Sequence, residues 1–401
     1  MPGILEKIKE VEAEMARTQK NKATEHHLGL LKAKLSKFRT ELMEPAKTVK
    51  GEGFDVMKSG DARCALIGFP SVGKSSFLNK VCTGTHSAEA SYEFTTLTCI
   101  PGLLQYKDAR IQILDLPGII EGASKGKGKG RQVIGVARSA DLVIMMLDGV
   151  RGEIQKKLLT KELEDCAIRL NQKQPDIYFK RQKSGGVKLT MTCRLTQLDE
   201  KLVRSILQQF KIHHCEIIIR EDCSADQFID VIEANRVYLP CLYVYNKIDN
   251  LTIEELDEIC RGQDHNVVCS VKLNLNIDFV LERLWNKLNM IRIYAKKKGS
   301  APDLNEPVIL RNGATIEHFC HSIHREMVAK FRYALVWGRS AKHRPQHVGL
   351  QHVLEDEDVV QHFFNHNKFL SYLIFKKKKL HSCASCNDQF LKNYTYKISF
   401  N

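Results

Sequence analysis

The 401-residue sequence predicts an α/β fold, a parallel sheet flanked by helices, with a helical hairpin before it and a small α+β domain after it. The sheet is predicted by short apolar runs that alternate with helical stretches beyond residue 60. These runs are Cys64–Phe69, Ile111–Leu114, Leu142–Leu147 and Cys241–Tyr245. The flanking parts are predicted by helical periodicity before residue 45 and by a β-like run followed by a helix after residue 290.

Residues 1–60 are expected to form a helical hairpin and a linker. Apolar residues repeat every three or four positions over 4–15 and again over 28–42, which is typical of two amphipathic helices. The polar stretch Thr18–Thr24 is expected to turn the chain between them, and Pro45 to end the second helix.

A glycine-rich segment follows the first apolar run and precedes a helical stretch. It consists of Gly68, Phe69, Pro70, Ser71, Val72, Gly73, Lys74 and Ser75, and it matches the phosphate-binding loop pattern in full. In such a loop the backbone N–H groups face phosphate oxygens, and the following helix N-terminus adds positive potential. We expect Lys74 to reach the β- and γ-phosphates and the Ser75 hydroxyl to bind Mg²⁺.

The next buried run ends in a second motif, formed by Asp115, Leu116, Pro117 and Gly118. An aspartate at this place can hold Mg²⁺ through water, and the amide of Gly118 can sense the γ-phosphate. Between the two motifs, Thr95 and Thr96 offer a hydroxyl that would complete the Mg²⁺ shell and close a switch over the nucleotide.

A third motif follows Cys241–Tyr245 and consists of Asn246, Lys247, Ile248 and Asp249. The Asp249 carboxylate can accept two hydrogen bonds from the guanine N1–H and N2-amino groups. Adenine lacks this pair of donors, so an adenine nucleotide would leave the carboxylate unpaired. Together the three motifs indicate a guanine nucleotide, and a P-loop kinase or ATPase remains the weaker interpretation.

The motif sequences GFPSVGKS (68–75), YEFTTLTCIPG (92–102), DLPGIIEGA (115–123) and NKID (246–249) resemble those of the developmentally regulated GTP-binding proteins, and are nearer to the second subgroup of this family of Obg-related GTPases. The resemblance covers about residues 1–361. It implies a P-loop GTPase G domain with an inserted small α/β domain, an N-terminal helical hairpin and a C-terminal TGS domain of ubiquitin-like α+β shape. The corresponding boundaries are 1–60, 61–290 with the insertion at about 178–240, 291–361, and an atypical tail at 362–401.

The resemblance also implies an activity and partners. The expected protein is a GTP-hydrolysing molecular switch, an enzyme that converts GTP to GDP and phosphate, associated with ribosomes and translation and with a family regulatory protein. The family pattern places the Mg²⁺-binding threonine at Thr96, so Lys74, Thr96 and Gly118 are the predicted catalytic residues. It places the guanine-stacking loop at Ser270, Val271 and Lys272, where Val271 is bulkier than the usual residue.

Residues 119 and 120 decide what is expected of the hydrolysis rate. Many small GTPases place a water-orienting glutamine here, whereas this chain has Ile119 and Ile120. Slow intrinsic hydrolysis is therefore expected, raised by another group, a partner or K⁺, although Ser71 stands where a cation-binding asparagine often lies. The alternative function is a GTP-binding scaffold that stabilises a partner with little turnover. The stretch Gly122–Arg131 is a candidate switch region, with a solvated loop as the alternative.

The spacing of the motifs supports an insertion independently of the resemblance. The segment between Asp115 and Asn246 is much longer than two strand–helix units of about 30 residues each require. Within it, a basic, glycine-containing stretch covers Lys180–Lys188, a strand-like run covers Glu216–Ile219 and a helical run covers Phe228–Glu233. Beyond the helix expected at Ile277–Met290, a strand at Ile291–Tyr294 and a helix at Thr315–Phe331 are predicted.

The composition of the chain predicts which partners and which cellular compartment are expected. With 61 basic and 47 acidic residues the net charge is +14, which favours encounter with RNA and predicts no specificity for a DNA sequence. No apolar run approaches the roughly 18 residues of a membrane span. The absence of a secretory signal and the 13 scattered cysteines predict reduced thiols in the cytoplasm, with a minor nuclear pool.

The tail at 362–401 resembles no part of the family. It contains Lys376–Lys379, which is typical of a solvated segment. The Cys383-x-x-Cys386 spacing has no second cysteine pair and is weak as a metal motif. His362-Phe363-Phe364 is expected to substitute for the end of the last TGS strand.

Overall fold

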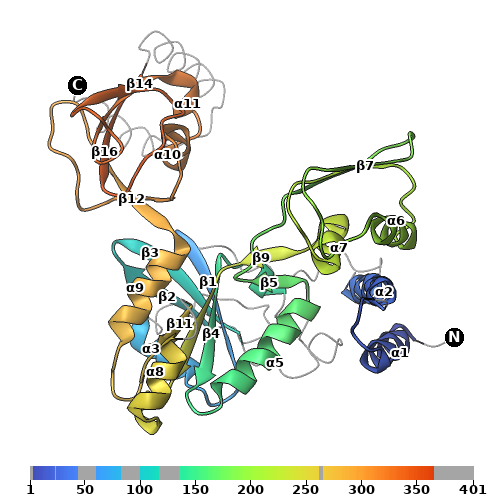
Figure 1. The fold of residues 1–401 in the computed structure, drawn as a ribbon. Helices are drawn as coiled ribbons and strands as arrows, with labels where there is room; N and C mark the ends of the chain where they lie inside the picture. Colours follow the sequence, from blue (N-terminus) through green and yellow to red (C-terminus); the bar gives the residue numbers. More distant parts are fainter. Residues whose placement is uncertain are drawn as a thin grey trace, which may run out of the picture. The chain divides into compact units, whose positions relative to one another are not determined.

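The computed structural model describes residues 3–22, 24–43, 60–82, 100–116, 135–261 and 265–364. Contacts divide the chain into two compact units, Met1–Leu288 and Asn289–Asn401 (Figure 1). Several predicted features lie outside the described residues: Pro45 and most of the linker, Thr95, Thr96, the segment from Pro117 to Arg131, and the tail beyond Phe364.

The N-terminal hairpin is confirmed. Helix α1 spans Ile4–Arg17 and helix α2 spans Glu25–Met43, joined by the polar turn expected from the sequence. Their apolar faces pack against each other because the three- to four-residue spacing places one stripe on each helix. The buried residues of this contact are Ile8, Val11, Leu31 and Leu35.

A six-stranded sheet forms the centre of the first unit, in the order β11-β10-β4-β1-β3-β2. Its strands are β1 (Ala62–Gly68), β2 (Ile100–Tyr106), β3 (Ala109–Asp115), β4 (Leu142–Asp148), β10 (Cys241–Asn246) and β11 (Asn266–Val268). The four predicted apolar runs fall in β1, β3, β4 and β10, which pair in parallel as expected. The edge strand β2 departs from an all-parallel sheet. It is antiparallel to β3 because only Lys107 and Asp108, both at positive φ, connect them.

Helices cover the sheet, which buries every residue of β1. They are α3 (Lys74–Val81), α5 (Gly152–Asp165), α8 (Ile253–Arg261) and α9 (Ile277–Leu288). The helix predicted to reach Met290 ends two residues earlier, because Asn289 adopts a positive φ of 52° and Met290 begins the next strand. Because β1, β3, β4 and β10 are parallel, their carboxyl ends meet at one edge of the sheet. The motif residues lie at this edge.

An excursion leaves the central sheet after α5 and returns before β10. Its first and last strands, β5 (Ile168–Leu170) and β9 (Val237–Leu239), pair in parallel. Between them lie β6 (Ile177–Arg181), β7 (Val187–Met191), α6 (Glu200–Gln209), β8 (Cys215–Ile219) and α7 (Ala225–Glu233). The predicted strand and helix correspond to β8 and α7. The basic, glycine-containing stretch at 180–188 forms parts of two strands, which are joined through Gly185 and Gly186 at positive φ.

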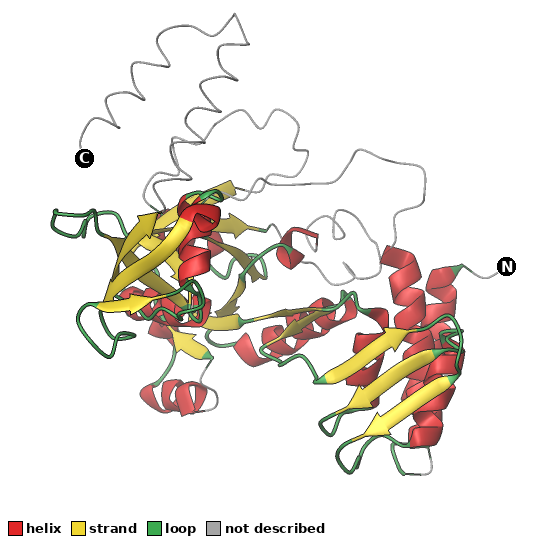
Figure 2. Ribbon diagram, turned by 90° about the horizontal axis from the view of Figure 1, so that it is seen from above, coloured by secondary structure: helices red, strands yellow, loops and turns green. Residues whose placement is uncertain are grey.

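The excursion has its own core and packs beside the hairpin. Its three strands pair in the order β6-β8-β7. The helices α6 and α7 contact α2, and Figure 2 shows the hairpin helices beside this sheet. Lys32 Nζ of α2 donates to Asp226 Oδ2 at 2.5 Å, and Thr40 Oγ1 donates to Glu233 Oε2 at 3.2 Å.

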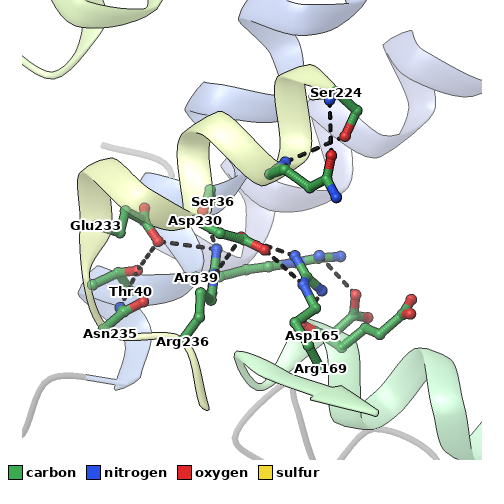
Figure 3. A network of polar contacts seen from close by, with 12 residues as sticks. Ser36, Arg39, Thr40, Asp165, Arg169, Ser224, Asp230, Glu233, Asn235 and Arg236 are labelled. Carbon is green, nitrogen blue, oxygen red and sulfur yellow. Dashed lines mark hydrogen bonds and ion pairs between the residues drawn. The ribbon is translucent and has the colours of Figure 1, made fainter. Parts of the chain in front are cut away.

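A buried polar network, here called the polar joint, links α2, the excursion and the α5–β5 segment (Figure 3). Arg169 donates to both carboxylate oxygens of Asp230, at 2.7 and 2.9 Å, and Arg236 donates to Asp230 at 2.7 Å. The Asp230 side chain is only 3% exposed. Arg236 also pairs with Glu233, and Arg39 with Asp165 at 2.7 Å. The polar joint comprises Arg39, Asp165, Arg169, Asp230, Glu233 and Arg236.

The second unit is a five-stranded sheet in the order β13-β12-β16-β14-β15, with helices against one face. Its elements are β12 (Met290–Ala295), β13 (Val308–Arg311), α10 (Ile316–Ile323), α11 (Met327–Lys330), β14 (Phe331–Trp337), β15 (Gln346–Val348) and β16 (Asp358–Phe364). The single helix predicted for Thr315–Phe331 was wrong. His324 is extended, with φ −163° and ψ 130°, so two helices form and Phe331 already belongs to β14.

Strand β16 passes the predicted end of the domain at residue 361. His362 and Phe363 pair with Ala334 and Tyr333 of β14, with an irregular register beside them. Each of the cysteines that the structure describes is a free thiol. No helix within the described ranges has the length and apolar character needed to cross a membrane.

Candidate nucleotide-binding site

The glycine-rich loop Gly68–Ser75 connects β1 to α3. Gly73 precedes the helix at φ 96°, a conformation that side chains rarely adopt. A Cβ on Gly68 would lie 2.5 Å from the Met146 carbonyl oxygen, and one on Gly73 would collide with Nδ2 of Asn246. Glycine is therefore required at both positions by close contacts with the neighbouring strands.

Lys74, the first residue of α3, folds back over this loop. Its Nζ donates to the carbonyl oxygens of Gly68 at 2.7 Å and Phe69 at 2.9 Å. Burial lowers the pKa of Lys74, and the nearby Asp115 carboxylate partly offsets this effect. The ammonium group is thus held at the loop in surroundings that favour a further negative charge beside it.

Ser75 and Asp115 meet at the ends of neighbouring elements. Ser75 Oγ donates to Asp115 Oδ2 at 3.3 Å. Burial raises the pKa of Asp115, against the opposing effects of Lys74 and Ser75. Its other oxygen, Oδ1, is buried and has no hydrogen-bond partner among the residues that the structure describes. Hard oxygen donors and an orphaned carboxylate oxygen are what Mg²⁺ favours, so these residues fit that ion.

Asn246, at the end of β10, connects two loops. Its Nδ2 donates to the Val72 carbonyl oxygen at 2.8 Å, and its Oδ1 accepts from the Val271 N–H at 3.0 Å. The side chain is buried. One amide therefore ties the phosphate-binding loop to the segment Ser270–Lys272, and the bulk of Val271 does not prevent this contact.

Asp249 and Lys247 are also held in place. Ser270 Oγ donates to Asp249 Oδ1 at 2.8 Å, which holds the exposed Asp249 side chain in place. Lys247, at φ 64°, donates to Asp148 Oδ2 at 2.8 Å. Burial acts to raise the pKa of Asp148, but hydrogen bonds from Lys247 and from backbone N–H groups lower it overall.

These segments surround one cavity of about 570 Å³. It is lined by Ser71, Gly73, Ser76, Lys80, Asn246, Lys247, Asp249, Asn250, Ser270, Val271 and Lys272. The structure therefore brings the first motif, the third motif and the 270–272 segment together. Leu116 is buried and is not part of the cavity lining, and its N–H donates to the Leu66 carbonyl oxygen. Thr96, Pro117, Gly118 and Ile119 are outside the described residues, as are Cys383 and Cys386.

Sequence reasoning missed Asp148, Ser76 and Lys80. Asp148 ends β4 and lies opposite Asn246 in the strand register. An acidic residue directly after the apolar run Leu142–Leu147 was the signal available for it. Ser76 and Lys80 lie within α3 and become part of the cavity only when β10 and the 270–272 segment pack beside that helix.

Removing the Asn246 amide should weaken nucleotide binding. We expect Asn246→Ala to reduce affinity for a fluorescent guanosine diphosphate by about tenfold or more, because two hydrogen bonds of about 1 kcal/mol each hold the loops. Asn266→Ala is the matched control, since the Asn266 amide bonds the Ile259 carbonyl oxygen at 3.0 Å and does not line the cavity. Equal affinity in the two variants would contradict the role given to Asn246.

Comparisons with known proteins agree with the site. Three family models match: "50S ribosome-binding GTPase" at residues 63–181, "C-terminal region of MMR_HSR1 domain" at 184–290 and "TGS domain" at 291–362. The Developmentally-regulated GTP-binding protein 2 sequences of Bos taurus and Homo sapiens are each 62% identical over 361 residues, 90% of this chain and 99% of theirs. The Dictyostelium discoideum homolog is 59% identical with the same coverage. The predicted P-loop GTPase fold with a C-terminal TGS domain is confirmed.

Proposed function

Because the chain belongs to the family of developmentally regulated GTP-binding proteins, we propose that it is a GTP-hydrolysing switch that acts at ribosomes with a regulatory partner protein. The observation that carries the nucleotide assignment is the cavity in which the phosphate-binding loop faces Asp249 and Ser270. One end is formed by Ser71 and Gly73 of the phosphate-binding loop, and the other offers a carboxylate to a base with two adjacent donors. Lys74 is not part of the cavity lining and is held on the loop carbonyl oxygens of Gly68 and Phe69.

The residues of the first two motifs take distinct roles in this proposal. The N–H groups around Gly73 and the N-terminus of α3 hold the phosphates, and Lys74 exchanges its loop carbonyl contacts for phosphate oxygens. Ser75 would hold Mg²⁺ directly, Asp115 would hold it through water, and Thr96 would complete its shell. The ion supplies charge neutralisation on the phosphates.

The switch is assigned to Thr96 and Gly118, both outside the described residues. Residues 135–138 form a short helical turn, and the Arg138 guanidinium donates to the Asn235 carbonyl oxygen beside the polar joint. This contact supports the proposal that a nucleotide-dependent change of conformation after Gly118 is transmitted to the hairpin and the excursion.

Turnover is proposed to be slow without a stimulator. Ile119 and Ile120 replace the water-orienting glutamine, so a partner or K⁺ is assigned the stimulating role. The same observation favours the second candidate, a GTP-binding scaffold with little turnover. Single-turnover hydrolysis measured with and without ribosomes, in K⁺ and in Na⁺, separates the two, and no acceleration in any condition favours the scaffold.

The ribosomal role is tested by cosedimentation. We expect the full chain to sediment with ribosomes several-fold more in the presence of a non-hydrolysable GTP analogue than with GDP, because contacts with the γ-phosphate are what hold the switch segments of GTPases in general. Lys74→Met should abolish this nucleotide difference.

The control for that experiment is Lys157→Met. Lys157 is exposed on α5 and does not line the cavity, so the same change of residue type should leave the nucleotide difference intact. Sedimentation that is identical in both nucleotide states of the unaltered chain would refute the ribosomal switch.

A further inference from the structure

The Asp249 carboxylate binds only part of the guanine base. In the proposed function, on which this inference rests, the carboxylate accepts from the N1–H and N2-amino groups. Guanine also carries two acceptors, O6 and N7, and O6 lies directly beside N1. A donor for O6 would therefore have to lie in the same cavity, close to Asp249.

Donors on the segments around Asp249 are already bound within the protein. The Val271 N–H donates to Asn246 Oδ1 at 3.0 Å, and Ser270 Oγ donates to Asp249 Oδ1 at 2.8 Å. The ammonium group of Lys247 is held at 2.8 Å by a carboxylate at the end of β4. These donors are therefore engaged in fixing the loops around the base.

Lys80 brings a further donor to this place from another element. It lies in the last turn of α3, outside all three motifs, and its side chain lines the same cavity as Asp249. Its Nζ donates to the Val271 carbonyl oxygen at 3.4 Å. An ammonium group has three hydrogens, and this single long bond leaves two of them for a ligand. The bond also holds the group beside the segment whose Ser270 fixes Asp249.

Lys272 is the other cation at this end of the cavity. It is exposed and lines the cavity as Lys80 does. Within the described ranges, however, no hydrogen bond or ion pair holds its side chain at the cavity. Lys80 is the better placed donor, because its contact with Val271 already restricts where its ammonium group lies.

We propose that the Lys80 ammonium group donates to O6 of the guanine base and is a second determinant of base specificity beside Asp249. Lysine contacts with guanine O6 are among the common specific contacts between proteins and this base. Adenine carries an amino group in place of O6, so two donors would face each other. The carboxylate and the ammonium group thus match neighbouring groups of guanine with opposite polarity.

The test measures how the full chain binds guanosine diphosphate and 6-thioguanosine diphosphate, in which sulfur replaces O6. Both compete against a fluorescent guanosine diphosphate. Lys80→Met should weaken binding of guanosine diphosphate by about tenfold or more, because a charged donor is lost. It should weaken binding of the thio analogue by only about threefold or less, because sulfur is a weak acceptor. Lys80 is exposed and methionine favours a helix about as well as lysine, so α3 should be retained.

Two further variants separate this role from a structural one. Lys80→Arg keeps a cationic donor and should restore most of the affinity for guanosine diphosphate. Lys157→Met makes the same change of residue type on α5, outside the cavity, and should leave both affinities unchanged. Equal weakening of the two ligands by Lys80→Met would show that Lys80 only supports the Val271 segment, and would overturn the proposal.

The proposal and the proposed function fail in different ways. A chain that binds guanosine diphosphate with the same affinity in Lys80→Met would refute the O6 contact and leave the guanine site intact. A chain that binds no guanosine diphosphate at all would refute the proposed function and this contact with it.

Discussion

Asp249→Asn is expected to shift the base preference of the cavity from guanine to xanthine. The asparagine carbonyl can accept from one base donor only, and its NH₂ group opposes the guanine N2-amino group. It matches the carbonyl oxygen that xanthine carries at this position. Guanine affinity should fall by about 100-fold or more, since hydrogen bonds to charged groups contribute about 1.5–3 kcal/mol each. Titration of fluorescent guanosine and xanthosine diphosphates measures both affinities.

The structure around residue 249 should not change in this variant. Ser270 Oγ donates to Oδ1 of Asp249, and an asparagine oxygen can accept the same hydrogen bond, so the loop keeps its anchor. Asp257→Asn is the control, because Asp257 lies on α8 and pairs with exposed Arg261. A guanine affinity that stays unchanged in Asp249→Asn, or an adenine nucleotide that competes equally with guanine, would refute the assignment of the base site.

Asp230→Asn is expected to cause the largest loss of stability. The substitution leaves the partly buried Arg169 and Arg236 facing a neutral amide at the buried position 230, and breaking a buried ion pair costs up to about 3–5 kcal/mol. Arg236 keeps its ion pair with Glu233 at 3.0 Å, so most of the loss in unfolding free energy comes from the broken ion pair of Arg169. Urea unfolding followed by circular dichroism, together with hydrogen exchange of α7 and β5, measures the change in unfolding free energy.

The matched control is Asp176→Asn. Asp176 pairs with Arg220 at 3.1 Å, but both side chains are more than half exposed, so the loss should stay below about 1 kcal/mol. Asp230→Leu combined with Arg169→Met should recover much of the stability, because well-packed apolar residues can replace a buried ion pair. Equal losses in Asp230→Asn and Asp176→Asn would show that burial of the polar joint contributes nothing.

Sequence reasoning succeeded where a function needs residues that are neighbours in the chain. The phosphate-binding loop is one contiguous segment after one apolar run, so its place at the end of β1 could be predicted. Contacts between residues that are far apart in the sequence could not be predicted. Asn246 bonds the carbonyl oxygen of Val72 only because β1, β4 and β10 lie next to one another in the sheet, and Lys247 bonds Asp148 only because β4 and β10 are paired in a particular register.

The errors in secondary structure have similar causes. The strands β6 and β7 carry exposed lysines on one sheet face, so they lack the apolar run that marked the central strands. The helix expected at Thr315–Phe331 has suitable apolar spacing, yet extended backbone at His324 divides it. Tertiary packing overrides local preference in both places.

The pairing of β5 with β9 has a consequence for the architecture of the first unit. Ile168 lies opposite Val237, so the chain leaves the central sheet and returns to it at almost the same point. To the six central strands the whole excursion is therefore part of one crossover connection between the parallel neighbours β4 and β10, whatever its length. The entropic cost of closing such a connection grows only slowly with its length. The excursion can thus be exchanged or enlarged while the strand order that carries the nucleotide motifs stays the same, provided that a crossover still joins the parallel strands β5 and β9.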